Sequence, residues 1–273
     1  MSKLIREFDA GVQGAALLGG KSSEGLLFTS GHKVLLQDLA EGTIRTLGDG
    51  YDLPSSIIAT PDGQSLLVVD LDPAEGHFVL YAASLSDAHR RHARALLRAR
   101  GRPTQLAVHG TTLFYADRST GRLSAVDLAA LRERGLADTP RSSKAREKSE
   151  ALAGHPRTLF EGLVSPVGLL VAPDGRRVYV SESKPGRIVS IGLDDGSRTV
   201  ERLGLAEPQY LTLGTRKHAV LVPLYRGAGS VQSWEPATDK VETLVEMSQA
   251  DRPFAAWEIG RNLVAVDRHR IHW

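Results

Sequence analysis

The stretch SPVGLLVAPDGRRVYVSESKPGRIVSIGLDDG, residues 165–196, decides the fold because it places short apolar runs between tight turns. The runs Val167–Ala172, Val178–Ser181 and Arg187–Leu193 have the length of β-strands, and a fourth, Thr199–Leu203, follows the last turn. The segments PDG, SKPG and DDG between them consist of turn-forming residues. The stretch therefore predicts one antiparallel unit of four strands.

The same pattern returns along the chain. The clearest second copy, Ser55–Leu85, has a PDG turn at the same place between its first two runs. Four-stranded units that repeat about every 40 to 50 residues are typical of β-propellers. We therefore predict an all-β fold, a six-bladed β-propeller with four-stranded blades, as a single domain over residues 1–273. The copies begin near Val12, Ser55, Thr104, Ser165, Pro208 and Pro253.

Two segments depart from the repeat. The last copy ends at Trp273 after three strands, while Lys3–Phe8 (KLIREF) is left over at the other end. Because an unpaired sheet edge invites aggregation, we expect this N-terminal strand to complete the C-terminal blade and close the ring. The polar, charged segment 129–155 is predicted to be an insertion in blade three, a partly helical or disordered loop between its outer two strands.

Composition excludes several classes of protein. The formal net charge of +2 is too balanced for a nucleic-acid-binding protein, whose basic residues gather on one face. The absence of cysteine excludes disulfides and thiolate metal sites, and it fits a reducing compartment. The sequence contains no apolar run long enough for a signal peptide or a membrane span. We expect a cytoplasmic monomer without nucleic-acid or membrane partners.

The segment GLLVAPDGRRVYVSESKPGRI, Gly168–Ile188, resembles the strictosidine synthase-like six-bladed propellers. Their matching region has an apolar strand, a PDG turn and a strand ending VAET or VSET before GRI. The related regucalcin and gluconolactonase family has similar PDG turns. The first resemblance implies a small organic substrate on the upper face of the ring and metal-free acid and base catalysis of a condensation or cyclisation, a lyase or cyclase reaction without a cofactor.

The second family binds a divalent cation through a Glu, an Asn and an Asp near the starts of inner strands. The matching segments SPVG, EPQY and RPTQ (165–168, 207–210 and 102–105) do not supply these ligands, so we predict no metal site of that kind. Two alternatives stay open. One is a metal-dependent lactone or ester hydrolase with differently arranged ligands, such as His32, Asp70 and His269; the other is a non-enzymatic scaffold that binds a ligand or a protein.

The candidate face is the edge of each blade where the first strand begins and the second strand ends. An acid repeated at the end of successive second strands accepts hydrogen bonds from turn N–H groups, so the repetition favours a structural role for Asp117 and Glu182. Histidines outside the repeat are better candidates, because imidazole can act as a base near neutral pH. The aligned column is Ser30, Asp70, Asp117, Glu182, Pro223 and Asp267.

From this face we select two sets of residues. The predicted catalytic residues are His32, His269, Glu182 and Asp70. The predicted substrate-binding residues are His77, Gln105, Gln209, Tyr210, Tyr225, Arg226 and Phe254. No metal ligand is assigned.

Overall fold

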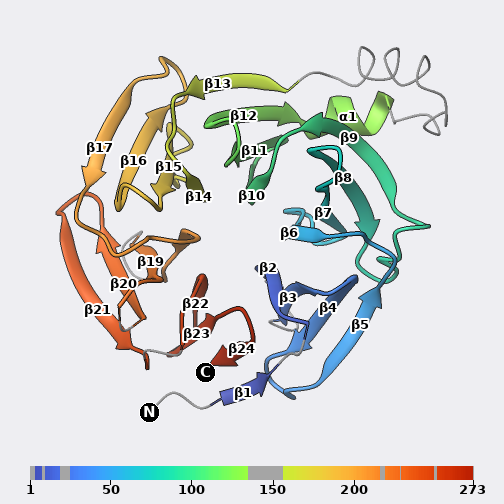
Figure 1. Ribbon diagram of the computed structural model, residues 1–273, viewed down its shortest axis with the longest axis horizontal. Coiled ribbons are helices and arrows are strands. Elements are labelled where there is room, and N and C mark those ends of the chain that lie inside the picture. Colours follow the sequence, from blue (N-terminus) through green and yellow to red (C-terminus); the bar gives the residue numbers. More distant parts are fainter. Residues whose placement is uncertain are drawn as a thin grey trace. The chain divides into compact units, whose positions relative to one another are not determined.

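The computed structural model describes residues 4–7, 10–18, 25–134, 156–215, 219–227, 229–248 and 251–272. In these ranges the protein is built from strands β1 to β24 and one short helix, α1 (Leu128–Arg134) (Figure 1). The strands form six sheets of four strands each. The fold is therefore an all-β, six-bladed β-propeller, as the sequence predicts.

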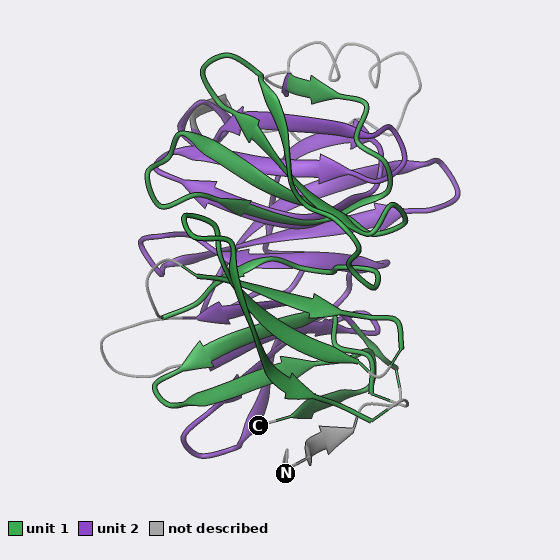
Figure 2. Ribbon diagram, turned by 90° about the vertical axis from the view of Figure 1, so that its left-hand side faces the viewer, with its two compact units in different colours: residues 1–12, 159–273 green, residues 13–158 purple. Residues whose placement is uncertain are grey.

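The chain divides into two compact units (Figure 2). The unit Gln13–Thr158 contains blades one to three, except Val12 and residues 159–161. Blade one is β2 (Val12–Leu18), β3 (Gly25–Ser30), β4 (Lys33–Asp38) and β5 (Ile44–Gly48). Blade two is β6 (Pro54–Ala59), β7 (Ser65–Asp72), β8 (His77–Ser84) and β9 (Arg94–Arg100). Blade three is β10 (Pro103–His109), β11 (Thr112–Asp117), β12 (Arg122–Asp127) and β13 (Arg157–Glu161).

The other unit, Met1–Val12 with Leu159–Trp273, contains the remaining blades. Blade four is β14 (Pro166–Val171), β15 (Arg177–Glu182), β16 (Arg187–Gly192) and β17 (Arg198–Arg202). Blade five is β18 (Thr212–Leu213), β19 (Val220–Leu224), β20 (Ser230–Glu235) and β21 (Lys240–Glu246). Blade six is β22 (Ala255–Ile259), β23 (Asn262–Val266), β24 (Arg270–His272) and β1 (Leu4–Glu7).

The N-terminal strand completes the last blade, as predicted. Leu4 pairs with His272 and Glu7 pairs with Arg270, both in antiparallel register. Blade six thus consists of three strands from the end of the chain and one from its beginning. Pairing β1 with β24 removes the open edge that three strands alone would leave.

The predicted insertion lies between β12 and β13, the outer two strands of blade three. Its first residues form α1, whose buried Leu131 belongs to an apolar core with side chains of β7 to β12. Residues 135–155 lie outside the described residues. The helix is short, and no helix of the described chain is long and apolar enough to cross a membrane.

The opening strand of three blades begins with a proline opposite an acid. Pro54 pairs with Asp70, Pro103 with Asp117 and Pro166 with Glu182, and each pairing is followed by a register irregularity. Proline suits the first position of a strand because it has no N–H group to give to the ladder. We call this end of each blade, where the first strand begins and the second strand ends, its upper edge.

A glycine and a hydroxyl join neighbouring blades within each unit. Ser181 Oγ accepts a hydrogen bond from the Gly168 N–H and donates one to the Gln209 carbonyl, both at 2.7 Å. Thr29 makes the equivalent pair of bonds between Gly14 and Pro54. A Cβ on Gly168 would lie 2.2 Å from the Gln209 carbonyl oxygen, so the blades approach too closely for a side chain there.

Candidate functional site

The predicted acid column is buried. Asp70, Asp117, Glu182 and Asp267 each have at most 5% of their surface exposed. A carboxylate that leaves water must have its oxygens hydrogen-bonded, because burying an unpaired charge is costly. The partners of each acid therefore show what it does.

Asp117 organises its turn. Its Oδ1 accepts hydrogen bonds from the N–H groups of Arg102 and Ser119 at 3.0 and 2.8 Å and from the Ser119 hydroxyl at 2.7 Å. Burial alone would raise the pKa of Asp117, but these hydrogen bonds outweigh it and hold the pKa below its ordinary value. The geometry agrees with the structural role expected from the repeat.

Glu182 lies in a similar but more strongly charged environment. It accepts a hydrogen bond from the Val164 N–H at 2.5 Å, and it pairs with the guanidinium groups of Arg187 and Arg198. Burial would raise its pKa, whereas the bonds from Arg187 and Val164 lower it, and the net pKa lies below the ordinary value. The contacts fix the start of β14 against the turn after β15. A catalytic role for Glu182 stays a prediction.

Asp70 differs in its protonation behaviour. It accepts hydrogen bonds from the N–H groups of Leu53 at 2.7 Å and Asp52 at 3.2 Å, and Arg90 Nε lies 3.4 Å from its Oδ2. Burial outweighs these interactions and raises the pKa of Asp70 above its ordinary value. A raised carboxyl pKa is what a general acid needs, so the geometry is compatible with the predicted catalytic role.

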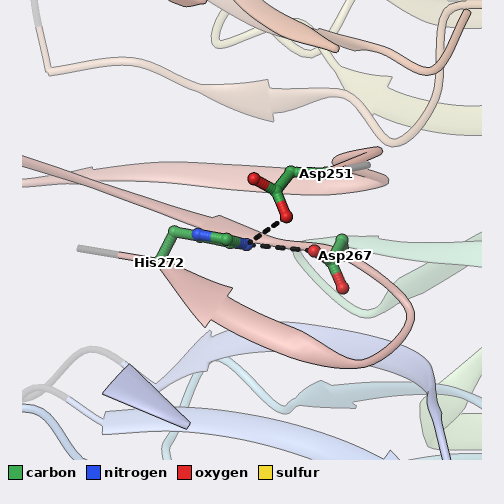
Figure 3. A group of neighbouring side chains, drawn as sticks. All are labelled: Asp251, Asp267 and His272. Carbon is green, nitrogen blue, oxygen red and sulfur yellow. Dashed lines mark hydrogen bonds and ion pairs between the residues drawn. The ribbon is translucent and has the colours of Figure 1, made fainter. Parts of the chain in front are cut away.

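Asp267 belongs to a cluster at the upper edge of blade six. His272 Nε2 lies 3.0 Å from Asp267 Oδ2 and 3.9 Å from Asp251 Oδ1 (Figure 3). The three ligand atoms lie within 4.8 Å of one another. Asp267 follows β23, His272 lies in β24, and Asp251 lies in the connection from β21 to β22. We call these three residues the Asp–His centre.

Asp267 uses one oxygen for the scaffold and presents the other to the imidazole, whereas both oxygens of Asp251 accept hydrogen bonds, Oδ1 from Arg270 and Oδ2 from Ser248. Asp267 Oδ1 accepts hydrogen bonds from the N–H groups of His269 and Arg270, both at 2.7 Å. Asp251 Oδ2 accepts one from the Ser248 hydroxyl at 2.7 Å. Hydrogen bonds of this kind orient the ligands of metal sites. Hydrogen bonds to the scaffold therefore hold both carboxylates of the centre.

The net charge of the Asp–His centre favours binding of a cation. Two carboxylates face one guanidinium, that of Arg270, whose Nη1 lies 2.9 Å from Asp251 Oδ1. With a neutral His272 the group carries a net charge of about −1, which a bound divalent ion would offset. One imidazole nitrogen and two carboxylate oxygens are ligands suited to Zn²⁺ or Mn²⁺. Because three ligands leave coordination positions open, the centre fits a reactive ion better than a closed structural one.

The predicted histidines lie at upper edges but in different units. His32 and His77 belong to the unit Gln13–Thr158, and His269 belongs to the other unit. His32 Nδ1 lies 2.8 Å from the Tyr51 carbonyl oxygen, so the side chain also holds the connection that precedes β6. His269 is exposed and follows Asp267 in the turn of blade six. Their catalytic roles stay predictions.

The structure brings two predicted substrate-binding residues into contact. The Tyr210 and Phe254 rings meet edge to face, with centroids 5.4 Å apart, and the Tyr210 N–H donates to the Phe254 carbonyl. Both side chains are buried, so they belong to the core and present little surface to a ligand. Gln209 precedes them, and its amide donates to the Glu207 carbonyl. Gln105 lies in β10, in the other unit.

Tyr225 and Arg226 follow β19 at the upper edge of blade five. Arg226 Nε pairs with Glu207 at 2.6 Å. The Tyr225 ring instead lies beneath two guanidinium groups, those of Arg252 at 5.4 Å and Arg268 at 5.9 Å from its centroid. Arg252 and Arg268 are absent from the predicted set.

His272 and Asp251 are not among the predicted site residues. His272 aligns with the buried Val189 of β16 and occupies a strand position, where the repeat suggests packing rather than chemistry. A polar residue at an apolar position of the repeat is the signal that could have found it. Asp251 lies in a connection without a repeated pattern, so no feature of the sequence places it beside β24.

Comparison with known proteins supports the fold. Neither a protein-family model nor a curated protein matches the sequence. A gluconolactonase from Xanthomonas campestris superposes with a TM-score of 0.69 at 13% identity, over 98% of this chain and 87% of that one. A structural genomics protein of unknown function from Bacteroides thetaiotaomicron gives 0.71 at 10% identity, over 100% and 71%. A chain of a nidogen/laminin complex gives 0.65 at 19% identity, over 89% and 85%.

At these identities the likeness concerns the fold alone. None of the three is described as a strictosidine synthase, so that resemblance stays a prediction. Because one propeller fold serves many functions, the activity has to be argued from the site.

Proposed function

We propose that this protein is a metal-dependent hydrolase of lactones or esters, with the ion held by Asp251, Asp267 and His272. The observation that carries the proposal is the convergence of three oriented ligand atoms within 4.8 Å of one another. The gluconolactonase of the same fold supports the choice of reaction class. When bound, a divalent ion polarises a carbonyl oxygen and lowers the pKa of a coordinated water.

In this proposal some residues bind the ion and others orient the residues that bind it. His272 supplies the nitrogen ligand, and it must be neutral to do so. The N–H groups of His269 and Arg270 fix the orientation of Asp267. Arg270 and Ser248 do the same for Asp251, so loss of either would loosen the centre without removing a ligand.

Metal binding by the purified full chain tests the proposal. The protein is dialysed against a chelator and then titrated calorimetrically with Zn²⁺ and Mn²⁺, and we expect one ion per chain. Asp267→Asn and His272→Gln should each weaken binding by about tenfold or more. His92→Gln is the matched control, because His92 also pairs with a carboxylate, Asp87 at 2.7 Å, but at an exposed site in the other unit.

Hydrolysis is then measured on a panel of aldonolactones and aryl esters, with and without the metal that binds. We expect turnover that requires the ion and is lost in His272→Gln. A folded protein that binds neither Zn²⁺ nor Mn²⁺ would refute the metal-dependent proposal.

A second candidate uses the same residues without a metal. His272 already lies at hydrogen-bonding distance from Asp267, and a carboxylate that orients an imidazole is the arrangement of a general base. This candidate corresponds to the lyase or cyclase reaction implied by the strictosidine synthase-like resemblance. Turnover that survives the chelator but is lost in His272→Gln would favour it over the hydrolase.

A further inference from the structure

Two arginines share one tyrosine at the upper edges of blades five and six. Tyr225 follows β19, Arg252 precedes β22 and Arg268 lies in the turn between β23 and β24. Both guanidinium groups lie within cation–π distance of the Tyr225 ring, at 5.4 and 5.9 Å from its centroid. The tyrosine is half-buried, whereas both arginines are exposed. Three separate segments of the chain thus form one cationic surface around an aromatic ring.

Nothing in the described part of the chain neutralises these two charges with a carboxylate. The neighbouring acids are already engaged, Asp251 with Arg270 and Asp267 with His272. Other arginines of this region do have acidic partners, as the pair between Arg226 and Glu207 shows. Two like charges held near one ring repel each other, and an anion between or beside them would remove that repulsion.

We propose that Arg252, Arg268 and Tyr225 form a binding site for a small organic oxyanion, a molecule that carries a carboxylate or phosphate group. A guanidinium group offers two parallel N–H donors that match the oxygens of such a group. The ring holds both guanidinium groups in place, which lowers the entropy lost when they bind a ligand. The exposed position of the arginines leaves the site open to solvent.

The oxyanion site lies beside the Asp–His centre. Arg252 follows Asp251 directly and Arg268 follows Asp267 directly, so the Cα atoms of each arginine and its neighbouring ligand are about 3.8 Å apart. The same two connections therefore carry two ligands of the centre and both guanidinium groups. If the proposed hydrolase is correct, its substrates are anionic lactones or esters. This last step rests on the proposed function, whereas the binding of the oxyanion does not.

Direct binding tests the site with the full chain and defined probes. Inorganic phosphate and succinate are titrated separately by isothermal calorimetry at low ionic strength, so that the two oxyanion chemistries are distinguished. Arg252→Gln and Arg268→Gln should each weaken binding of the preferred probe by about tenfold or more, because each removes a charge-assisted interaction. Arg177→Gln is the matched control, since that guanidinium group is also exposed in the same unit but already pairs with Glu201 at 3.5 Å. It should change the affinity less than about twofold.

A pair of tyrosine variants examines how the arginines are held. Tyr225→Phe keeps the ring face and should retain binding, whereas Tyr225→Leu removes it and should weaken binding. The inference is overturned if the wild-type protein binds neither probe, or if Arg177→Gln weakens binding as much as the other arginine variants do. Calorimetry with Zn²⁺ is run on the same samples. Oxyanion binding without metal binding would refute the hydrolase and leave this site standing, and the reverse result would refute this site alone.

Discussion

Replacing Glu182 distinguishes a structural role of this side chain from a catalytic one. Glu182→Gln keeps the size of the side chain but removes the negative charge that faces Arg187 and Arg198. A hydrogen bond to a charged group contributes about 1.5 to 3 kcal/mol, and breaking a buried ion pair costs about 3 to 5 kcal/mol. The two arginine side chains are 22% and 29% exposed, so water solvates them partly after the change and reduces the cost.

We therefore expect Glu182→Gln to lower the free energy of unfolding by about 2 to 3 kcal/mol, near the lower end of these ranges. For a chain of this size that corresponds to a fall in Tm of roughly 5 to 10 °C. Urea unfolding followed by circular dichroism and extrapolated to zero denaturant measures the free energy directly. Glu242→Gln, on the exposed face of β21, is the control and should stay within about 0.5 kcal/mol of the wild type.

Two results would refute this reasoning. A loss of less than about 1 kcal/mol would show that the ion pairs with Arg187 and Arg198 contribute little to the folded state. A stable, fully folded Glu182→Gln variant without turnover or ligand binding would show instead that Glu182 acts in catalysis.

The pKa values of Asp117 and Glu182 are both lowered in the folded protein. The two ionised carboxylates therefore stabilise the folded state fully above their unfolded pKa values, which are near 4 to 4.5. This stabilisation is lost as the pH falls through the pKa values of the folded state. Urea midpoints measured from pH 7 to pH 3 should therefore fall on acidification, and they should fall less steeply in Glu182→Gln; an equally steep fall in the variant would contradict the assignment. Removing residues 1–10 should lower both Tm and solubility, because β24 loses its partner strand β1. A truncated protein as soluble and as heat-resistant as the full chain would disprove the closing role of this strand.

The blades could be predicted because they are specified locally. The predicted strands of residues 165–203 agree with β14 to β17 within about two residues, and the turns between them contain the expected glycines. Gly175 and Gly196 have positive φ angles of 68° and 67°, the conformation that tight turns require and that glycine adopts readily. Turn chemistry depends on a few adjacent residues, so a single sequence is sufficient to recognise it.

The candidate centre could be predicted only in part. Asp267 belongs to the repeated acid column, which the sequence displays, but its partners come from two other segments. Asp251 lies 16 residues before Asp267 in the sequence and His272 lies five residues after it, in the strand that pairs with β1. The contacts of Arg252 and Arg268 with the Tyr225 ring likewise join three separate segments of the chain. Contacts among such separate segments depend on how whole blades pack, and no local sequence pattern encodes that packing.

Asp267 of blade six occupies the position of Glu182 in blade four, but it has different partners because the turn that follows it is shorter. In blade four, five positions separate Glu182 from its strand partner Arg187, and the acid pairs with that arginine. In blade six only three positions separate Asp267 from Arg270, whose N–H donates to Oδ1. Asp267 Oδ2 then faces the next strand, where His272 replaces an apolar residue of the repeat. A shortened turn and one polar strand residue thus convert a scaffold acid into a member of the Asp–His centre.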